Sequence, residues 1–393
     1  MNLDKPRLPV TLVSDSAGIS HLVAALSAAD AIGLDAERAS GFRYSHKAYL
    51  IQIAIADNGI WIVDPLQTLE DMPLLAKAMH DKVWLLHAAT QDLPCLAELG
   101  IRPTKIVDTE LGARLAGQEK VGLGSLCESL LDLKLAKEHS AADWSKRPIP
   151  QEMLDYAALD VDVMFELWEA IASLLEEQGK SEWAKQEFEH LVGFEPKPAH
   201  PEPWRNLPGM ARVRDLNKLK IAANLHSVRD QLAMEQDIAP GRLIPDRSIA
   251  AAALQAPESK SALVANKEFQ GRASRTLINT WWEAIQQSQH LEIKLDSDHK
   301  GNGIPNHKSW EKRFPQAHQR LEVVRPLVVA KAQELGLPVE NLLTPDTLRR
   351  VVFEPDADLE RQLLDLGARS WQVEITLPLI RSGLVAASSL PAV

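Results

Sequence analysis

The 393-residue sequence has little cysteine and no long apolar run. Its two cysteines, Cys95 and Cys127, form no CxxC pair and are typical of buried thiols in a reducing cytoplasm. Apolar stretches such as "VVRPLVVAKA" contain charges or prolines and are too short to span a bilayer. No basic start followed by an apolar segment opens the chain. We therefore expect no signal peptide, no membrane partner and a cytoplasmic location.

Basic residues are fewer than acidic ones, with 43 Lys and Arg against 54 Asp and Glu and a formal net charge of −11. Residues 1–200 hold 18 Lys and Arg against 31 Asp and Glu, whereas residues 205–325 hold 19 against 13. The overall balance argues against nucleic acid as a partner, but its distribution suits a cation-binding site joined to a module that contacts phosphates. Ordinary solvated surface charge explains the same counts equally well.

The length predicts two or three domains, and the first half alternates strand-like with helix-like segments. Strands are expected over 31–36, 49–56, 60–64 and 83–87, with a short extended piece over 105–107, and helices over 68–79, 91–99, 108–117 and 150–178. Asn58-Gly59 predicts a hairpin turn between two of the strands. The pattern predicts a mixed sheet flanked by helices, an α/β domain over residues 1–193.

Five prolines mark residues 194–209 as a linker, and the remainder reads as helix and loop. Within it, "APGRLIPDRSI" (239–249) is similar to "LPVENLLTPDTL" (337–348). This weak internal repeat predicts two related all-α helical bundles, over 210–290 and 315–393, separated by a second linker over 291–314.

Two acids share one face of the first predicted strand, in the stretch "AIGLDAERAS" (31–40). Side chains alternate along a strand, so Asp35 and Glu37 point the same way. Facing a shared interior, they would repel each other and raise each other's pKa unless a cation lay between them. A strand end emerging into solvent, or the paired acids of a glycoside hydrolase, would give the same pattern.

Two further acids have simple structural explanations. Asp92 follows "VWLLHAATQ" and stands in the first turn of a predicted helix, where an acid stabilises the helix dipole. Asp108, in "IVDTELGARL", is typical of an N-cap. Taken alone, neither indicates a site.

The helix predicted from residue 150 carries the most informative acid. Pro150 suits its first turn and Gly179 its end. At about 100° per residue, Asp160 falls inside the apolar arc, and Tyr156 lies one turn earlier on the same face. A single charge in a buried stripe is costly unless it is paired or bound to metal.

Together, Asp35, Glu37, Asp92 and Asp160 offer only oxygen ligands, with no His or Cys cluster of the zinc type. Such a set favours Mg²⁺ or Mn²⁺. Two such ions about 4 Å apart can clamp a phosphodiester for in-line attack by water. Tyr156, next to them, could orient that water or accept its proton.

At this point the residues resemble a known family, ribonuclease D, in the DEDDy group of 3′→5′ exonucleases on the ribonuclease H-like fold. The resemblance covers roughly residues 10–190 and rests on the spacing of "GLDAERASGFRYSHKAYLIQIA", "LLHAATQDLPCLAELGI" and "HSAADWSKRPIPQEMLDYAALDVDVM". Asp35 and Glu37 match the first motif of the family, Asp92 the second, and Tyr156 with Asp160 the third.

The resemblance implies a metal-dependent 3′→5′ exoribonuclease that trims single-stranded RNA 3′ ends, with tRNA precursors as substrate class and no obligate protein partner evident. The four carboxylates would bind two Mg²⁺ or Mn²⁺ ions, and Tyr156 would position the attacking water. The two helical modules look like HRDC domains, thought to hold nucleic acid near the active site, the second of them divergent.

Several residues depart from the family pattern or stay ambiguous. Ala36 and Arg38 stand where many relatives have Thr and Phe, and Arg38 would contact a phosphate or point away. His87 reads as a strand-end polar group more than as a ligand. Trp204, Trp281 and Trp282 could stack on bases, although core packing is the better interpretation of the tandem pair.

Three rival functions stay open at this stage. A DNA exonuclease would carry the same motifs, because they do not show a preference for the 2′-OH. A non-catalytic RNA-binding protein on this fold would be expected to lack a carboxylate, and none of the four is missing. A glycosidase needs only two carboxylates, which would leave Asp92 and Asp160 unexplained.

Overall fold

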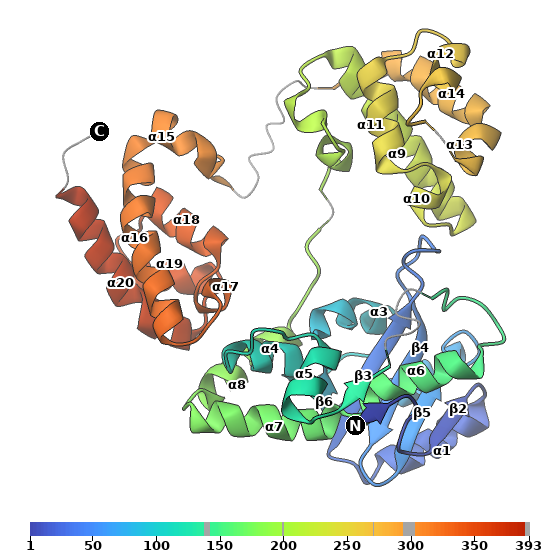
Figure 1. Cartoon of the computed structure of the whole chain (residues 1–393), viewed down its shortest axis with the longest axis vertical. Helices are drawn as coiled ribbons and strands as arrows, with labels where there is room; N and C mark the ends of the chain where they lie inside the picture. The colour runs from blue at the N-terminus through green and yellow to red at the C-terminus, as the bar shows by residue number, and fades with distance from the viewer. Residues whose placement is uncertain (137–141, 199, 270, 294–302, 390–393) are drawn as a thin grey trace.

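The computed structural model describes residues 1–136, 142–198, 200–269, 271–293 and 303–389. The described elements form three groups, namely a sheet with its flanking helices, helices α9 to α14, and helices α15 to α20 (Figure 1). Part of the predicted second linker, residues 294–302, lies outside the described residues, and the domain limits given above stay predictions.

Six strands form the main sheet in the order β2-β5-β4-β3-β6-β7. Their bounds are β2 Val10–Val13, β3 Ala31–Arg38, β4 Ala48–Ile55, β5 Gly59–Val63, β6 Val83–Leu86 and β7 Lys105–Asp108. Strands β3, β4 and β5 form an antiparallel meander, whereas β2, β6 and β7 pair in parallel with β5, β3 and β6. A short pair, β1 (Asn2–Leu3) with β8 (Lys134–Leu135), lies apart from it. The predicted mixed sheet is confirmed, and β2 is an addition to it.

Helices cover both faces of this sheet, which explains why β4 is buried along its whole length. The helices of this part are α1 Ser16–Leu26, α2 Met72–Met79, α3 Leu93–Glu98, α4 Thr109–Leu115, α5 Leu123–Leu130, α6 Gln151–Asp162, α7 Met164–Glu177 and α8 Ser181–Val192. Ile51 and Ile53 pack in the core that includes α1 and α2, whereas Leu50 and Ala54 pack in the core beneath α6. Alternate residues of one strand therefore serve opposite faces.

The prediction of one continuous helix over 150–178 was wrong. The chain forms two helices, since α6 ends at Asp162 and the cap residue Val163, with φ of −100° and ψ of −4°, separates it from α7. α6 packs on β3, β4 and β5, while α7 packs on α4, α8 and β6. The apolar periodicity continues across the break, so the pattern did not show it.

The two other groups are helical throughout the described residues. The first consists of α9 Leu216–Gln236, α10 Pro240–Leu243, α11 Asp246–Gln255, α12 Lys260–Ala265, α13 Arg272–Thr276 and α14 Ile278–Gln287, and the second of α15 Trp310–Arg313, α16 Pro315–Glu334, α17 Val339–Leu342, α18 Pro345–Phe353, α19 Leu359–Asp365 and α20 Ser370–Ser388. Trp204 and Trp281 are buried in the core of the first group, and Trp282 packs against it partly buried. Core packing is thus confirmed for Trp281, and Trp204 offers little open surface for stacking.

Both helical groups contact the sheet domain. At the start of α20, Arg369 donates to Glu187 of α8 (Nε to Oε1, 2.7 Å), and the Trp371 ring stacks on Trp183 at 4.7 Å between centroids. The loop after β3 meets the first group, where the Arg242 guanidinium lies 4.0 Å from the centre of the Phe42 ring. No helix among the described residues has the length and apolar character needed to cross a membrane.

Candidate active site

A cavity of about 630 Å³ lies where the end of β3 faces α6. Its lining comes from β3, the loop that follows it, the turn before α3, α4, the start of α5, α6 and the start of α7. The acidic residues among them are Asp35, Glu37, Asp92, Glu110 and Asp160. All four sequence-predicted carboxylates therefore line one cavity.

Three of the carboxylates form a tight cluster. Asp35, Glu37 and Asp160 each offer an oxygen atom, and these atoms all lie within 4.8 Å of one another. The alternation of β3 places the first two on one face, as expected. Helix α6 packs on this face and brings Asp160 close to them. Each of the three is half-buried.

Asp92 lines the same cavity but lies outside this cluster. It is 4% exposed and stands at the junction of a short 3₁₀ turn, Ala89–Gln91, with α3. Asp108 holds this turn, because its carboxylate accepts from the backbone N–H groups of Ala88 (3.1 Å) and Ala89 (2.8 Å). Asp108 is also the N-cap of α4, as predicted, so one side chain fixes two elements.

Burial raises the pKa values of all four carboxyl groups, and the charges of neighbouring acids add to this effect for three of them. Burial raises the pKa of Asp35 to about 6, although the Ala36 N–H and the Arg38 charge act in the opposite direction. Burial, followed by the charges of the other three acids, raises the pKa of Glu37 to about 10. Burial and the charge of Asp35 likewise raise the pKa of Asp92 and of Asp160 well above the usual range. Deprotonating all four in the bare cavity is therefore costly.

Tyr156 lines the cavity one helical turn before Asp160. Its pKa is raised, first by burial and then by the charges of Asp160, Glu37 and Asp35, so it is a neutral hydroxyl at physiological pH. Its ring lies 6.3 Å from that of the fully buried Trp144. Arg147 fixes the Trp144 segment, because it donates to the Trp144 carbonyl (2.7 Å) and to Asp64 (Nε to Oδ2, 2.6 Å).

Arg38 is the only lysine or arginine among the described residues that line the cavity. The β3–β4 register shifts between Glu37 and Arg38, and such a bulge changes the direction in which a side chain points. Its Nη2 lies 3.5 Å from Gln91 Oε1 and 4.0 Å from Asp92 Oδ1. Both distances are long for charged partners, so the guanidinium is only loosely held.

His87 lines the same cavity and behaves as a strand-end polar group. Its Nδ1 lies 2.9 Å from Thr109 Oγ1. Burial lowers its pKa to about 4, which keeps the ring neutral. The ring therefore adds no positive charge to the site.

The sequence interpretation missed two residues near the site. Phe42 lines the cavity from the loop after β3. Gln52 is fully buried in the middle of β4, directly opposite Asp35 in the strand register. The available signal was its isolation, since it is the only amide in the otherwise apolar run "YLIQIAIA".

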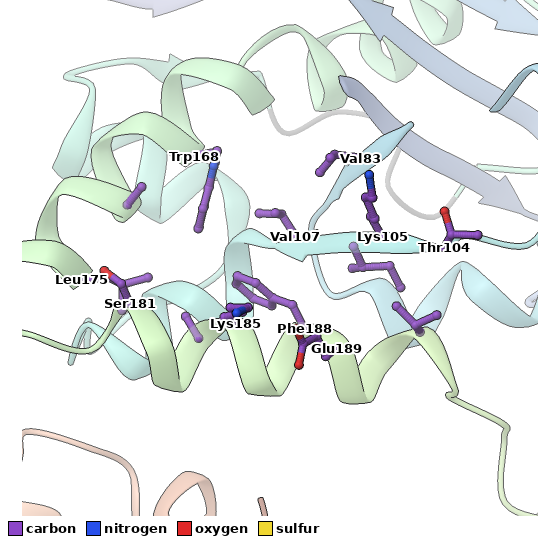
Figure 2. Close-up of a pocket in the computed structure, with 14 residues that line it drawn as sticks. Val83, Thr104, Lys105, Val107, Trp168, Leu175, Ser181, Lys185, Phe188 and Glu189 are labelled. Carbon is purple, nitrogen blue, oxygen red and sulfur yellow. The ribbon is translucent and has the colours of Figure 1, made fainter. Parts of the chain in front are cut away.

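A second cavity, of about 450 Å³, has a different character (Figure 2). It lies between β7, α7 and α8, and Figure 2 shows Trp168, Val107 and Phe188 pointing into it. Glu189 is the only acid among its described lining residues. Among the described residues, this second cavity therefore has no cluster of carboxylates.

The donor set of the first cavity fits divalent cations. Its ligand atoms are carboxylate oxygens, the ligands that Mg²⁺, Mn²⁺ and Ca²⁺ prefer. Three of them converge closely enough to share an ion, and among the described lining residues only Arg38 brings a positive charge to the five acids. A bound cation would remove the repulsion that raises their pKa values.

Three family models match the chain. One described as a 3′-5′ exonuclease matches residues 10–176, and the HRDC domain model matches residues 218–285. A model described as the 3′ to 5′ exonuclease C-terminal domain matches residues 303–384. The two helical groups are therefore matched by different models.

Known proteins agree with these matches. The ribonuclease D of Zymomonas mobilis is 32% identical over 300 residues, which are 74% of this chain and 76% of the relative. A crystal structure of a protein from Bifidobacterium adolescentis has a TM-score of 0.88 at 33% identity, covering 98% of this chain and 99% of that one. The crystal structure of Escherichia coli RNase D shares the fold with a TM-score of 0.71 at 20% identity, covering 96% of this chain and 99% of that one.

Proposed function

The chain belongs to the ribonuclease D family, and from this we propose that it is a metal-dependent 3′→5′ exoribonuclease that shortens single-stranded RNA, with tRNA precursors as its substrate class. One observation carries the proposal. The four sequence-predicted carboxylates, a neutral tyrosine hydroxyl and a loosely held arginine line a single cavity of about 630 Å³. These groups can bind divalent cations, orient a water molecule and contact a phosphate, which are the roles that metal-dependent hydrolysis of a phosphodiester needs.

The carboxylates of Asp35, Glu37, Asp92 and Asp160 would hold two divalent cations, Mg²⁺ or Mn²⁺. Ions bound there would lower the pKa of a bound water and neutralise the charge that develops on the phosphate. The three clustered acids and the separate position of Asp92 support two ions in preference to one.

Tyr156 would direct the attacking water. Its neutral hydroxyl can accept a hydrogen bond from the water and donate one to a phosphate oxygen. The water oxygen would bond to phosphorus while the bond to the 3′-oxygen of the preceding nucleotide breaks, and one water proton would pass through solvent to that leaving oxygen. The products are a nucleoside 5′-monophosphate and a chain shorter by one residue, with a free 3′-hydroxyl.

Arg38 would bind a non-bridging oxygen of the terminal phosphodiester. It lines the cavity, and its contacts to Gln91 and Asp92 are long enough to be exchanged for a phosphate at little cost. An arginine here replaces the aromatic residue that many relatives have at this position. The chain would therefore hold the terminal nucleotide by charge at this point instead of by stacking.

We propose RNA over DNA as the substrate. The support for this choice is that the 32% identical relative is named ribonuclease D. The basic segment 205–325, which includes the HRDC match, would add contacts to phosphates without regard to sequence. Binding should then weaken steeply with salt.

The test compares 3′-labelled and 5′-labelled single-stranded RNA, each incubated with the protein in Mg²⁺ or Mn²⁺ and in EDTA. We expect the 3′ label to be released first as a mononucleotide and the 5′-labelled chain to shorten stepwise, with both reactions abolished by EDTA. Internal cleavage, release from the 5′ end or activity in EDTA would contradict the proposal. A DNA strand of the same sequence and an unprocessed tRNA transcript, assayed in parallel, decide the substrate class.

A further inference from the structure

Gln52 is a buried amide without a partner. It lies in the centre of β4 with 0% of its surface exposed. Neither its Nε2 nor its Oε1 has a hydrogen-bond partner among the described residues. Buried polar groups are paired in the large majority of cases, because an unpaired one loses its bonds to water without replacement. An exception in the middle of a sheet therefore calls for a functional explanation.

The strand register places this amide beside a proposed metal ligand. Gln52 is directly opposite Asp35 on β3 and directly opposite Ile62 on β5. Residues directly opposite each other in an antiparallel pair point to the same face, with Cβ atoms about 4.5–5.5 Å apart. Of these two lateral neighbours, only Asp35 offers a hydrogen-bond acceptor.

This shared face is the one that α6 covers. A Cβ added to Gly33, two residues before Asp35, would lie 3.3 Å from the Val161 carbonyl oxygen of α6. Next to Gln52 along β4, Leu50 and Ala54 belong to the apolar core on this side. Gln52 is thus a polar residue between apolar neighbours of its own strand, on the sheet face that carries Asp35.

Given the proposed function, we infer that Gln52 is a positioning residue whose Nε2 donates a hydrogen bond to the Asp35 carboxylate when that carboxylate holds a cation. A carboxylate has lone pairs enough to accept this bond and to ligate an ion at the same time. Hydrogen bonds of this kind orient metal-binding side chains, and their loss commonly lowers metal affinity or activity by 10–100-fold.

The experiment replaces the amide by an apolar side chain of similar length, Gln52→Met. The matched control is Ile62→Met, on the other side of Gln52 and away from Asp35. Three quantities are measured: the Mn²⁺ dissociation constant by calorimetry, the metal-free Tm, and kcat and KM on single-stranded RNA.

For Gln52→Met we expect Mn²⁺ affinity and kcat to fall by about 10-fold or more, with KM within about twofold. The metal-free Tm should stay the same or rise, because an unpaired buried amide has been removed. A purely structural role would lower the Tm and leave metal affinity unchanged. Ile62→Met should keep the metal affinity of the unaltered protein.

Wild-type Mn²⁺ affinity in Gln52→Met, or an equal loss of affinity in Ile62→Met, would overturn the inference. Should Gln52→Met fail to fold, a crystal structure of the unaltered protein with Mn²⁺ decides. A distance of about 3.2 Å or less between Nε2 and an Asp35 oxygen supports the inference, and one above about 4 Å refutes it. If the protein binds Mn²⁺ but leaves RNA intact, the proposed function fails, whereas Gln52 is still judged on affinity and distance.

Discussion

Asp160 and Asp162 belong to the last turn of the same helix, α6, yet they are in opposite electrostatic situations. Two residues apart on a helix, they point about 200° away from each other. Asp162 is buried and accepts hydrogen bonds from Nε and from the backbone N–H of Arg7, both at 3.1 Å. Asp160 faces Asp35 and Glu37 and has no ion pair among the described residues. A buried acid beside an arginine stabilises the fold, whereas one beside other acids indicates a site.

The same contrast extends to the rest of the sheet domain. Asp64 pairs with Arg147 and so holds the Trp144 segment that packs near Tyr156. Glu187 pairs with Arg369 and so holds α20 against α8. These paired acids hold elements of the fold together, and we call them the frame. Asp35, Glu37 and Asp160 have no ion pair among the described residues and form the unpaired cluster of the cavity.

The largest expected effect comes from removing one charge of the unpaired cluster of Asp35, Glu37 and Asp160. Asp160→Asn should lower kcat on RNA by about 10³-fold, because a lost metal ligand forfeits several kcal/mol of transition-state stabilisation. The metal-free variant should nevertheless unfold at a higher temperature at pH 8, since one repelling carboxylate is gone. Single-turnover assays and thermal unfolding measure the two quantities. A variant that is both active and less stable would show that Asp160 belongs to the frame.

The paired acid should show the reverse. Asp162→Asn is expected to lower the free energy of unfolding by about 1–2 kcal/mol, less than a fully buried pair would cost because Arg7 is partly exposed. Its kcat should stay within about threefold of the unaltered value. Urea unfolding and the RNA assay test both statements. A loss of activity comparable to that of Asp160→Asn would remove the distinction between frame and cavity.

Arg38, the only lysine or arginine among the described residues that line the cavity, is tested for a role in substrate binding. Arg38→Ala should raise KM for RNA about 10-fold, the value of a charge-assisted hydrogen bond to phosphate. It should also tighten Mn²⁺ binding a few-fold, because a like charge near the ions is gone. Calorimetry with Mn²⁺ separates the alternatives. Weaker Mn²⁺ binding would mean that Arg38 serves to hold Asp92 in place and does not bind substrate.

The pH dependence of stability gives the smallest effect. A carboxyl group with a raised pKa binds more protons in the folded than in the unfolded chain. Its stability contribution is full below the unfolded value, near 4, and is lost as pH rises through about 6 for Asp35 and towards 10 for Glu37. The metal-free Tm should therefore fall by a few degrees between pH 5 and 8, and the gain on adding Mn²⁺ should grow over the same range. A Tm independent of pH in both states would contradict the repulsion.

Much of the site could be predicted from local patterns. Alternation along β3 put Asp35 and Glu37 on one face, and helical phase put Asp160 beside Tyr156, because both regularities act over a few residues. The break at Val163 was not predicted, since it depends on what each half of the helix packs against. Pairs such as Arg7 with Asp162 join residues far apart in the chain, and no local pattern carries them. The partnerless state of Gln52 likewise depends on the whole sheet.

The contrast between Asp160 and Asp162 can be tested in one measurement. Single-stranded RNA labelled at its 5′ end is digested with equal amounts of the unaltered protein, Asp160→Asn and Asp162→Asn in Mn²⁺, and the products are separated at single-nucleotide resolution. The account predicts a ladder that shortens from the 3′ end for the unaltered protein and Asp162→Asn, and an intact strand for Asp160→Asn. A ladder produced by Asp160→Asn at the rate of the unaltered protein would contradict it.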